Sequence, residues 1–173
     1  MTETFRILAI WLDRVSASLN RVSLTLGVSM LIIMLAAVAL QVVARYLLAS
    51  APTWTEELAR YSMVWAGYLG ATVAFYSNAD PVLHTPSGGS LFMHRFWLVV
   101  RNIAGLVFLL PVVYWSPAII GHHMLRETES LGIVSGYVML VVPTFCTIIL
   151  VHIVARLAIE FTSSGQNTVG EML

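Results

Sequence analysis

The residues best able to do chemistry lie in one short polar stretch between two apolar runs. Arg45, Glu56, Glu57 and Arg60 bring four charges together beside Trp54. Arg60 follows Glu56 by four residues and Glu57 by three, so on a helix its guanidinium can pair with either carboxylate. We assign these five residues a candidate structural or subunit-interface role, and no catalytic role.

The same stretch carries a signal for the start of a helix. Thr53 precedes Glu56 by three residues, which is the spacing of a capping box and predicts a helix beginning at Trp54. Two interpretations of the charges stay open. An exposed cap and ion pair would contribute only about 0–1 kcal/mol. Alternatively, the four charges cross-link two helix ends and hold a fixed surface for another subunit, with Glu57 and Arg60 partly buried.

Histidines could in principle ligate haem or a metal. His122 and His123 end one predicted membrane span, whereas His152 lies near the opposite side of the membrane at the end of the next. These positions are about 30 Å apart, so one haem cannot be ligated by both. Cys146 is the single cysteine, and no Cys–His spacing resembles a zinc site. We therefore expect no catalytic, cofactor-binding or metal-ligating residue in this chain.

Composition sets the class of protein to which these residues belong. Of 173 residues, 58% are hydrophobic and 10% are charged, and the mean hydropathy is +0.85. Soluble domains carry about 45–50% apolar and about 25% charged residues. The composition therefore excludes a soluble enzyme and a disordered segment. Because the net charge is zero, it also excludes a nucleic-acid partner, which would favour a basic chain.

Gaps between charges predict the helices that position the polar stretch. Four uncharged runs reach or approach the roughly 20 residues that cross a bilayer as a helix; they cover residues 22–44, 61–79, 102–121 and 130–155. We predict an all-α membrane protein with four transmembrane helices, forming a single integral membrane domain over residues 1–173. The expected helices cover residues 22–48, 54–77, 94–124 and 132–161, followed by a polar tail at 163–173.

The first twenty residues are amphipathic. Their apolar side chains repeat at steps of three and four, which places them on one helical face. This pattern predicts a short interfacial helix over residues 5–20, lying along the membrane before the first span. A simple extension of the first span, or a face packed on a partner, fits the pattern about as well.

Small residues and prolines indicate how the spans pack and bend. Ala66, Gly70 and Ala74 recur every four residues and form a helix-packing stripe that lets another helix approach closely. Kinks are expected in the third span and in the fourth, because prolines lie within both, namely Pro111, Pro117 and Pro143.

Arginines in the short loops predict the orientation of the chain. With a cytoplasmic N-terminus, six of the nine arginines lie on the cytoplasmic side and three lie on the other. We therefore expect both termini in the cytoplasm.

The run RYLLASAPTWTEELARYSMVWAGYLGA at 45–71 resembles the signature of the small permease subunit of TRAP (tripartite ATP-independent periplasmic) transporters. That signature has an Arg and an aromatic residue ending the first span, then a Trp, two acidic residues and an Ala-Arg-aromatic entering the second. The later run ETESLGIVSGYVMLVVP at 127–143 resembles the family's third loop and fourth span. The matching residues are Arg45, Tyr46, Trp54, Glu56, Glu57, Ala59, Arg60, Tyr61, Glu127, Ser130, Leu131, Gly132 and Pro143.

This resemblance implies a division of labour in a bacterial or archaeal inner membrane. A periplasmic substrate-binding protein captures an organic acid, and a large permease subunit carries the acid and sodium across by an elevator-like movement. The present chain would be a fixed four-helix partner, surrounded by membrane lipids, with no cofactor of its own. Sodium coupling would belong to the large subunit.

The loop at 77–96 departs from the family pattern, so no role is carried onto it. The alternative function is a four-helix membrane anchor subunit of a redox complex.

Overall fold

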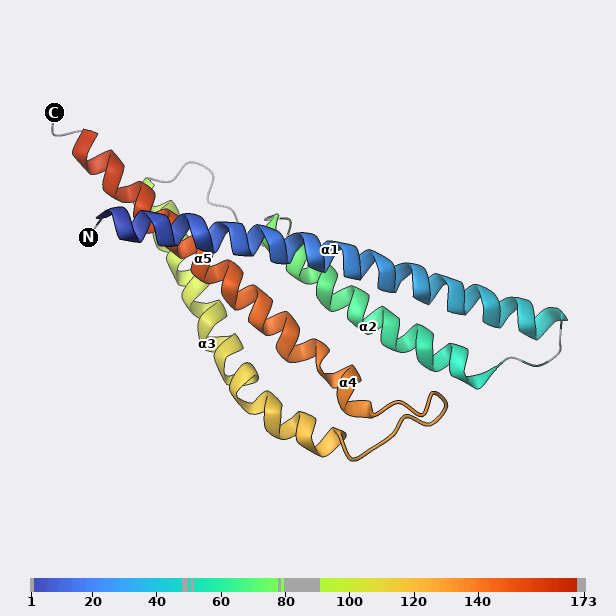
Figure 1. Ribbon diagram of the computed structural model, residues 1–173. Coiled ribbons are helices and arrows are strands. Elements are labelled where there is room, and N and C mark those ends of the chain that lie inside the picture. Colours follow the sequence, from blue (N-terminus) through green and yellow to red (C-terminus); the bar gives the residue numbers. More distant parts are fainter. Residues whose placement is uncertain (1, 48–49, 51, 78, 80–90, 171–173) are drawn as a thin grey trace.

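The computed structural model describes residues 2–47, 50, 52–77, 79 and 91–170, and its regular structure is helical (Figure 1). An isolated antiparallel bridge pairs Glu127 with Val134 in the loop before α4. This architecture confirms the all-α fold predicted from the sequence. The helices in chain order are α1 (Thr2–Leu47), α2 (Thr53–Tyr76), α3 (Leu91–His123), α4 (Ser135–Met139) and α5 (Val141–Gly170).

Helix α1 is one uninterrupted helix of 46 residues. The separate interfacial helix predicted over residues 5–20 is not found, because these residues and the first span belong to the same helix. The sequence gives the physical reason: no proline lies between Thr2 and Leu47, and the one glycine there, Gly27, lies well inside the apolar run. With no proline or glycine near residue 21, helical hydrogen bonding continues through.

Among the residues that the structure describes, three segments are long and apolar enough to cross a membrane, namely Ile7–Leu47, Val99–His123 and Ser135–Ile159. Helix α2 is not among them, so the fourth predicted span is not confirmed. The charges of Glu56, Glu57 and Arg60 occupy the start of α2 and leave only residues 61–76 uncharged. An upright helix needs about 20 residues to cross a bilayer, and this run is shorter.

Prolines affect the third and fourth spans differently. Pro111 and Pro117 lie inside α3, which follows a curved path in Figure 1. Pro143 instead lies in the first turn of α5, just after the break between α4 and α5 at Leu140. Because proline has no N–H, it cannot donate to the carbonyl of Met139, so helical hydrogen bonding does not run continuously from α4 into α5.

The C-terminal part of the chain also differs from the expected polar tail. Helix α5 extends to Gly170, so residues 163–170 are helical, and residues 171–173 lie outside the described part of the chain.

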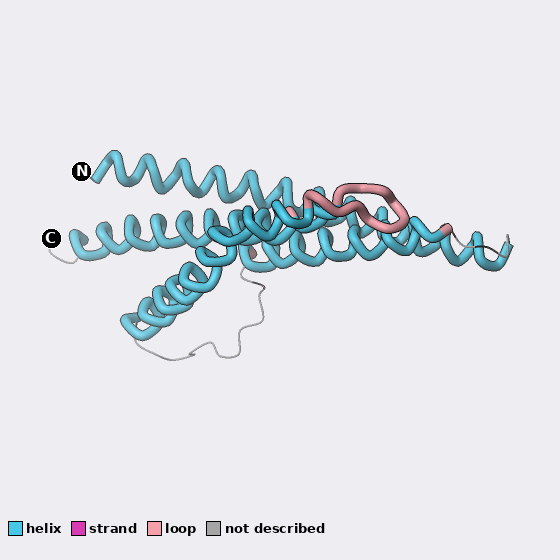
Figure 2. The backbone as a smooth tube through the Cα atoms, turned by 90° about the horizontal axis from the view of Figure 1, so that it is seen from below, coloured by secondary structure: helices cyan, strands magenta, loops and turns pink. Residues whose placement is uncertain are grey.

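Helix α5 is central to the arrangement, since it contacts α1, α2 and α3, while α1 packs most extensively on α2. Figure 2 shows α3 inclined to the other long helices. A small core joins α3 and α5, and its buried residues are Leu109, Cys146, Ile149 and Ile153. Most large apolar side chains on the outer faces of α1 and α3 remain exposed. Exposed apolar surface of this extent indicates contact with lipid or with another protein.

Candidate functional site

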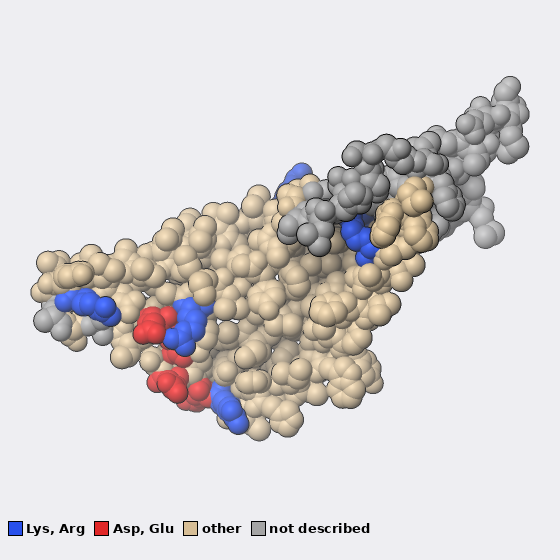
Figure 3. All heavy atoms as spheres, turned by 180° about the vertical axis from the view of Figure 1, so that it is seen from behind, with Lys and Arg blue, Asp and Glu red and all other residues tan. Residues whose placement is uncertain are grey.

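The polar junction, formed by the start of α2 and the loop at 124–134 between α3 and α4, is the main concentration of charge in the described part of the chain. Figure 3 shows acidic and basic side chains gathered at this end of the molecule, while most of the same face is uncharged.

Helix α2 begins without the predicted capping box. Its N-cap is Pro52, whose side chain makes no capping hydrogen bond, and Thr53 is already helical. The Thr55 hydroxyl donates to the Pro52 carbonyl at 2.6 Å. Proline takes the cap position because its fixed φ, here −64° with ψ 128°, suits the extended backbone that precedes a helix. The predicted start at Trp54 is therefore one residue late, and Glu56 is free for another partner.

Glu57 connects α2 to a segment far away in the sequence. Its Oε2 atom accepts hydrogen bonds from the backbone N–H groups of Ser130 and Leu131, each at 2.8 Å. Its Oε1 atom accepts a hydrogen bond from the Tyr61 hydroxyl at 2.7 Å. Both carboxylate oxygens are thus engaged, and the first turn of α2 is held against the loop.

The loop presents these N–H groups because it is folded as a short hairpin. The N–H of Thr128 donates to the Ile133 carbonyl at 2.8 Å, and the N–H of Ile133 donates to the Thr128 hydroxyl at 3.0 Å. The turn closes at Gly132, whose φ of 62° favours glycine. Internal hydrogen bonds occupy the two sides of the hairpin, which leaves the N–H groups at its tip to bind the carboxylate.

These hydrogen bonds lower the pKa of Glu57 below its ordinary value of 4.5. The largest cause is the hydrogen bond from Tyr61, and the backbone N–H groups of Ser130 and Leu131 act in the same direction. Partial burial raises the pKa and opposes them. Each donor favours the ionised carboxylate, so Glu57 is held as an anion at neutral pH.

The other predicted junction residues are arranged more loosely. Arg60 pairs with Glu56 at 2.8 Å, and both side chains are 64% exposed, so the expected burial of Arg60 is wrong. Arg45 is exposed at the end of α1, and no ion pair joins it to the described acidic side chains. Trp54 is 40% exposed. The charges therefore act as one exposed pair, one engaged carboxylate and one separate arginine.

The small-residue stripe lies partly where α1 crosses α2. A Cβ atom built on Gly27 of α1 would lie 3.4 Å from the Leu69 Cβ, 3.8 Å from the Gly70 nitrogen and 3.9 Å from the Ala66 carbonyl oxygen. The close approach here depends on Gly27 of α1, whereas a Cβ atom built on Gly70 would meet no heavy atom within 4 Å, so the packing role of the Ala66–Gly70–Ala74 stripe stays a prediction. Sequence reasoning missed Gly27, although a lone glycine within an apolar helix is a signal for such packing.

A second polar cluster, also missed, joins the other ends of α1, α2 and α5. The Ser16 Oγ and His152 Nδ1 atoms lie 2.6 Å apart and are both buried. Tyr76 packs its ring on the His152 ring with centroids 5.2 Å apart. Arg156 donates to the Phe75 carbonyl at 2.9 Å, and its guanidinium lies over the Phe75 ring. The cluster is a helix-packing contact between three helices.

Within the residues that the structure describes, no three His, Cys, Asp or Glu side chains are grouped as metal ligands would be. His84 lies outside the described residues.

The fold is that of a helical integral membrane protein. Its helices have apolar outer faces, polar contacts hold the helix ends together, and one end of the molecule carries a charged surface. The family model for tripartite ATP-independent periplasmic transporters, DctQ component, matches residues 34–162, and the chain belongs to this family. It is therefore a small membrane subunit of a TRAP transporter, a transporter component of the inner membrane and not a member of an enzyme family. A comparison with curated proteins finds no match.

Proposed function

We propose that this chain is the fixed partner of a large, elevator-type TRAP permease subunit and supports sodium-coupled uptake of an organic acid delivered by a periplasmic binding protein. The observation that carries the proposal is the family match over residues 34–162. It includes both elements of the polar junction, α2 and the loop at 124–134. Sodium and substrate sites would then belong to the large subunit.

The packing of the chain supports a partner role. Side chains such as Leu35, Val107 and Phe108 are 56%, 67% and 73% exposed, and they lie on helices that are apolar enough to cross a membrane. Exposed apolar surface of this extent marks contact with lipid or with another membrane subunit. The whole chain would act as one integral membrane domain with both termini in the cytoplasm.

The polar junction supports a fixed rather than a moving subunit. Glu57 ties α2 to the loop before α4 through two backbone hydrogen bonds. Such a contact would keep the exposed Glu56–Arg60 pair and Trp54 in one arrangement. We propose that this end of the molecule, including Arg45, is a subunit-interface surface.

Co-purification tests the proposal directly. The chain would carry an affinity tag and be produced together with the large permease subunit of the same transporter. We expect the two to elute as one complex after solubilisation in mild detergent. A tagged, unrelated four-helix membrane protein is the control for non-specific capture. Failure of the large subunit to co-elute, with both proteins stable and membrane-inserted, would contradict the proposal.

Reconstitution tests the division of labour. Proteoliposomes with the chain alone should take up none of three labelled probes (a dicarboxylate, a 2-oxo acid and a sulfonate) under an inward sodium gradient. Vesicles with the chain, the large subunit and the binding protein should take up at least one, and omitting the chain should abolish that uptake. Sodium-driven uptake by the chain alone would make it an independent carrier.

A further inference from the structure

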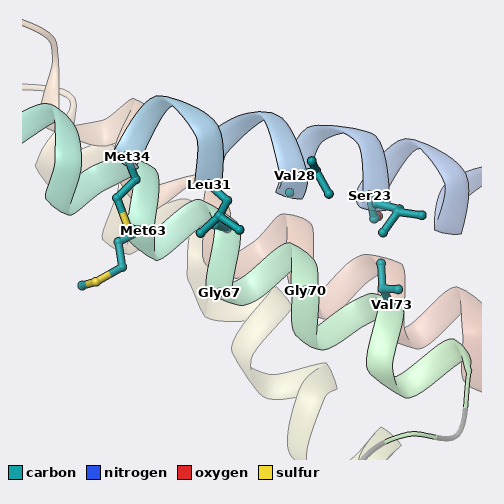
Figure 4. Close-up of a pocket in the computed structure, with 11 residues that line it drawn as sticks. Ser23, Val28, Leu31, Met34, Met63, Gly67, Gly70 and Val73 are labelled. Carbon is teal, nitrogen blue, oxygen red and sulfur yellow. The ribbon is translucent and has the colours of Figure 1, made fainter. Parts of the chain in front are cut away.

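A narrow apolar groove, here called the α1–α2 groove, runs between the first two helices (Figure 4). Its volume is about 450 Å³. Residues from Ser23 to Met34 line it on α1, and residues from Met63 to Val73 line it on α2. Apart from Ser23, its lining is apolar.

The chain does not fill this groove itself. Gly67 and Gly70 of α2 line it, and a Cβ atom built on either glycine would meet no heavy atom within 4 Å. Gly27 differs, because its Cβ would contact Leu69 of α2. The space beside the Cα atoms of Gly67 and Gly70 is therefore open.

The length of the groove distinguishes between occupants. Ser23 and Met34 are eleven residues apart, which is about 16 Å at a helical rise of about 1.5 Å per residue. The hydrocarbon core is about 30 Å thick, so the groove extends over about one leaflet. An acyl chain also occupies one leaflet, whereas a transmembrane helix of a partner crosses both.

Charge at one end of the groove matches a phospholipid. Arg21 is exposed and precedes Ser23 by two residues, and it is the last charge before the uncharged run at 22–44. Because charged side chains are costly inside the hydrocarbon core, we place its guanidinium at the border between water and the apolar core. Arginine binds phosphate through paired N–H groups, and basic residues at this depth attract lipid headgroups.

We infer that the α1–α2 groove binds one acyl chain of a phospholipid whose phosphate pairs with Arg21. Transfer of an acyl chain from the bilayer to an apolar groove brings no hydrophobic gain, since both environments are apolar. Binding rests instead on dispersion contacts with the exposed backbone at Gly67 and Gly70 and on the phosphate–Arg21 contact. This lipid site is separate from the polar junction and from the proposed sodium and substrate sites.

Photolabelling in a membrane tests the inference. The full chain is reconstituted in nanodiscs that contain a phosphatidylglycerol with a diazirine in its acyl chain, with and without the large subunit. We expect labelled peptides to concentrate within 23–34 and 63–73 in both samples. Gly67→Leu should reduce this labelling to the level of other exposed apolar segments. Gly121→Leu on α3, where a Cβ also meets nothing within 4 Å, is the matched control and should leave the labelling unchanged.

The headgroup contact has its own pair of variants. Arg21→Gln should lower the retention of phosphatidylglycerol in native mass spectra by about fivefold. This factor corresponds to about 1 kcal/mol, the contribution of one basic residue at a membrane surface. Arg14→Gln, an exposed arginine earlier on α1, should have no such effect.

Two results would overturn the site. One is even labelling along all exposed apolar faces, which indicates bulk lipid only. The other is loss of groove labelling when the large subunit is present, which indicates a protein helix in the groove. Gly70→Leu repeats the test if Gly67→Leu does not fold, and the labelling map of the unaltered chain is decisive by itself.

Discussion

The Oε2 atom of Glu57 lies 2.8 Å from the backbone nitrogen of Ser130, although 73 residues separate them in the sequence. The same oxygen accepts the N–H of Leu131. The carboxylate thus binds the tip of a hairpin through two adjacent N–H groups. This geometry gives Glu57 a role that Glu56, its neighbour on α2, does not share.

The two adjacent glutamates should respond differently to substitution. Glu57→Ala removes the acceptor for two backbone N–H groups and for Tyr61, so we expect a lower Tm by several degrees and weaker recovery of the large subunit. Glu56→Ala removes only an exposed pair with Arg60, which costs about 0–1 kcal/mol or less. A thermal melt of both variants in the same detergent measures the difference. Equal melting temperatures would show that the Glu57 contact does not stabilise the fold more than the exposed Glu56–Arg60 pair does.

The stabilisation from Glu57 should depend on pH. Its pKa is lower in the folded chain than the ordinary value of 4.5, so the unfolded chain binds the proton more readily. The contribution of ionised Glu57 to the free energy of unfolding is fully present above about pH 4.5. It is lost as the pH falls through the lower pKa of the folded chain. The Tm difference between the unaltered chain and Glu57→Gln should therefore shrink on acidification. A difference that grows as the pH falls would contradict this sign.

The contact between Ser16 and His152 should stabilise the packing of α1 on α5. Ser16→Ala leaves the buried His152 Nδ1 without its hydrogen-bond partner. In membrane proteins such bonds average about 0.6 kcal/mol, with a maximum of about 1.7, and we expect a loss within that range. Ser29→Ala is the matched control, because Ser29 is exposed and donates within its own helix to the Thr25 carbonyl. Denaturation in mixed detergent compares the two, and equal losses would count against a tertiary role for Ser16.

Glycine substitutions should separate a close helix crossing from open surface. Gly27→Ala adds a Cβ at ordinary contact distance from Leu69 and should be tolerated. Gly27→Leu forces further atoms between α1 and α2, and such overpacking costs typically about 1–3 kcal/mol. Gly121→Leu, with nothing within 4 Å of its Cβ, should leave the Tm unchanged. A stable Gly27→Leu would show that the crossing can open without loss.

The predicted orientation can be tested without purification. Reporter enzymes that are active only in the cytoplasm, fused before Met1 or after Leu173, should both be active. The physical reason is the excess of arginine on that side of the membrane. Periplasmic reporters at the same positions are the matched control, and activity from either would reverse the proposed topology.

Local sequence signals predicted which segments are helical but not the residues at which the helices begin and end. Long uncharged runs and the absence of proline from 22–47 predict a helix there with little ambiguity. The start of α2 was misplaced because Thr53 and Glu56 have capping-box spacing, whereas Pro52 takes the cap position. The N-terminal helix was separated from the first span because amphipathicity shows which face is apolar, not where a helix ends.

The polar junction shows the same limit at the level of tertiary contacts. Spacing on one helix identified the Glu56–Arg60 pair, which the structure contains. It could not show that Glu57 binds the N–H groups of Ser130 and Leu131, because backbone donors leave no residue-type signal. The contact between Ser16 and His152 was missed for a related reason: His152 was considered only as a possible ligand, and Ser16 lies 136 residues away from it in the sequence.

The continuity of α1 determines how it must sit in a bilayer. Its 46 residues span about 69 Å, because an α-helix rises about 1.5 Å per residue. This length is more than twice the thickness of the hydrocarbon core, which is about 30 Å. A straight helix of this length either projects into water or is steeply tilted, and packing against neighbouring helices and interfacial anchors set the tilt. Because the helix has no hinge at residue 21, a change in bilayer thickness that tilts its apolar half must also swing Trp11 and Ser16. Any tilt of α1 therefore also moves the end of the helix that carries the Ser16 contact with His152.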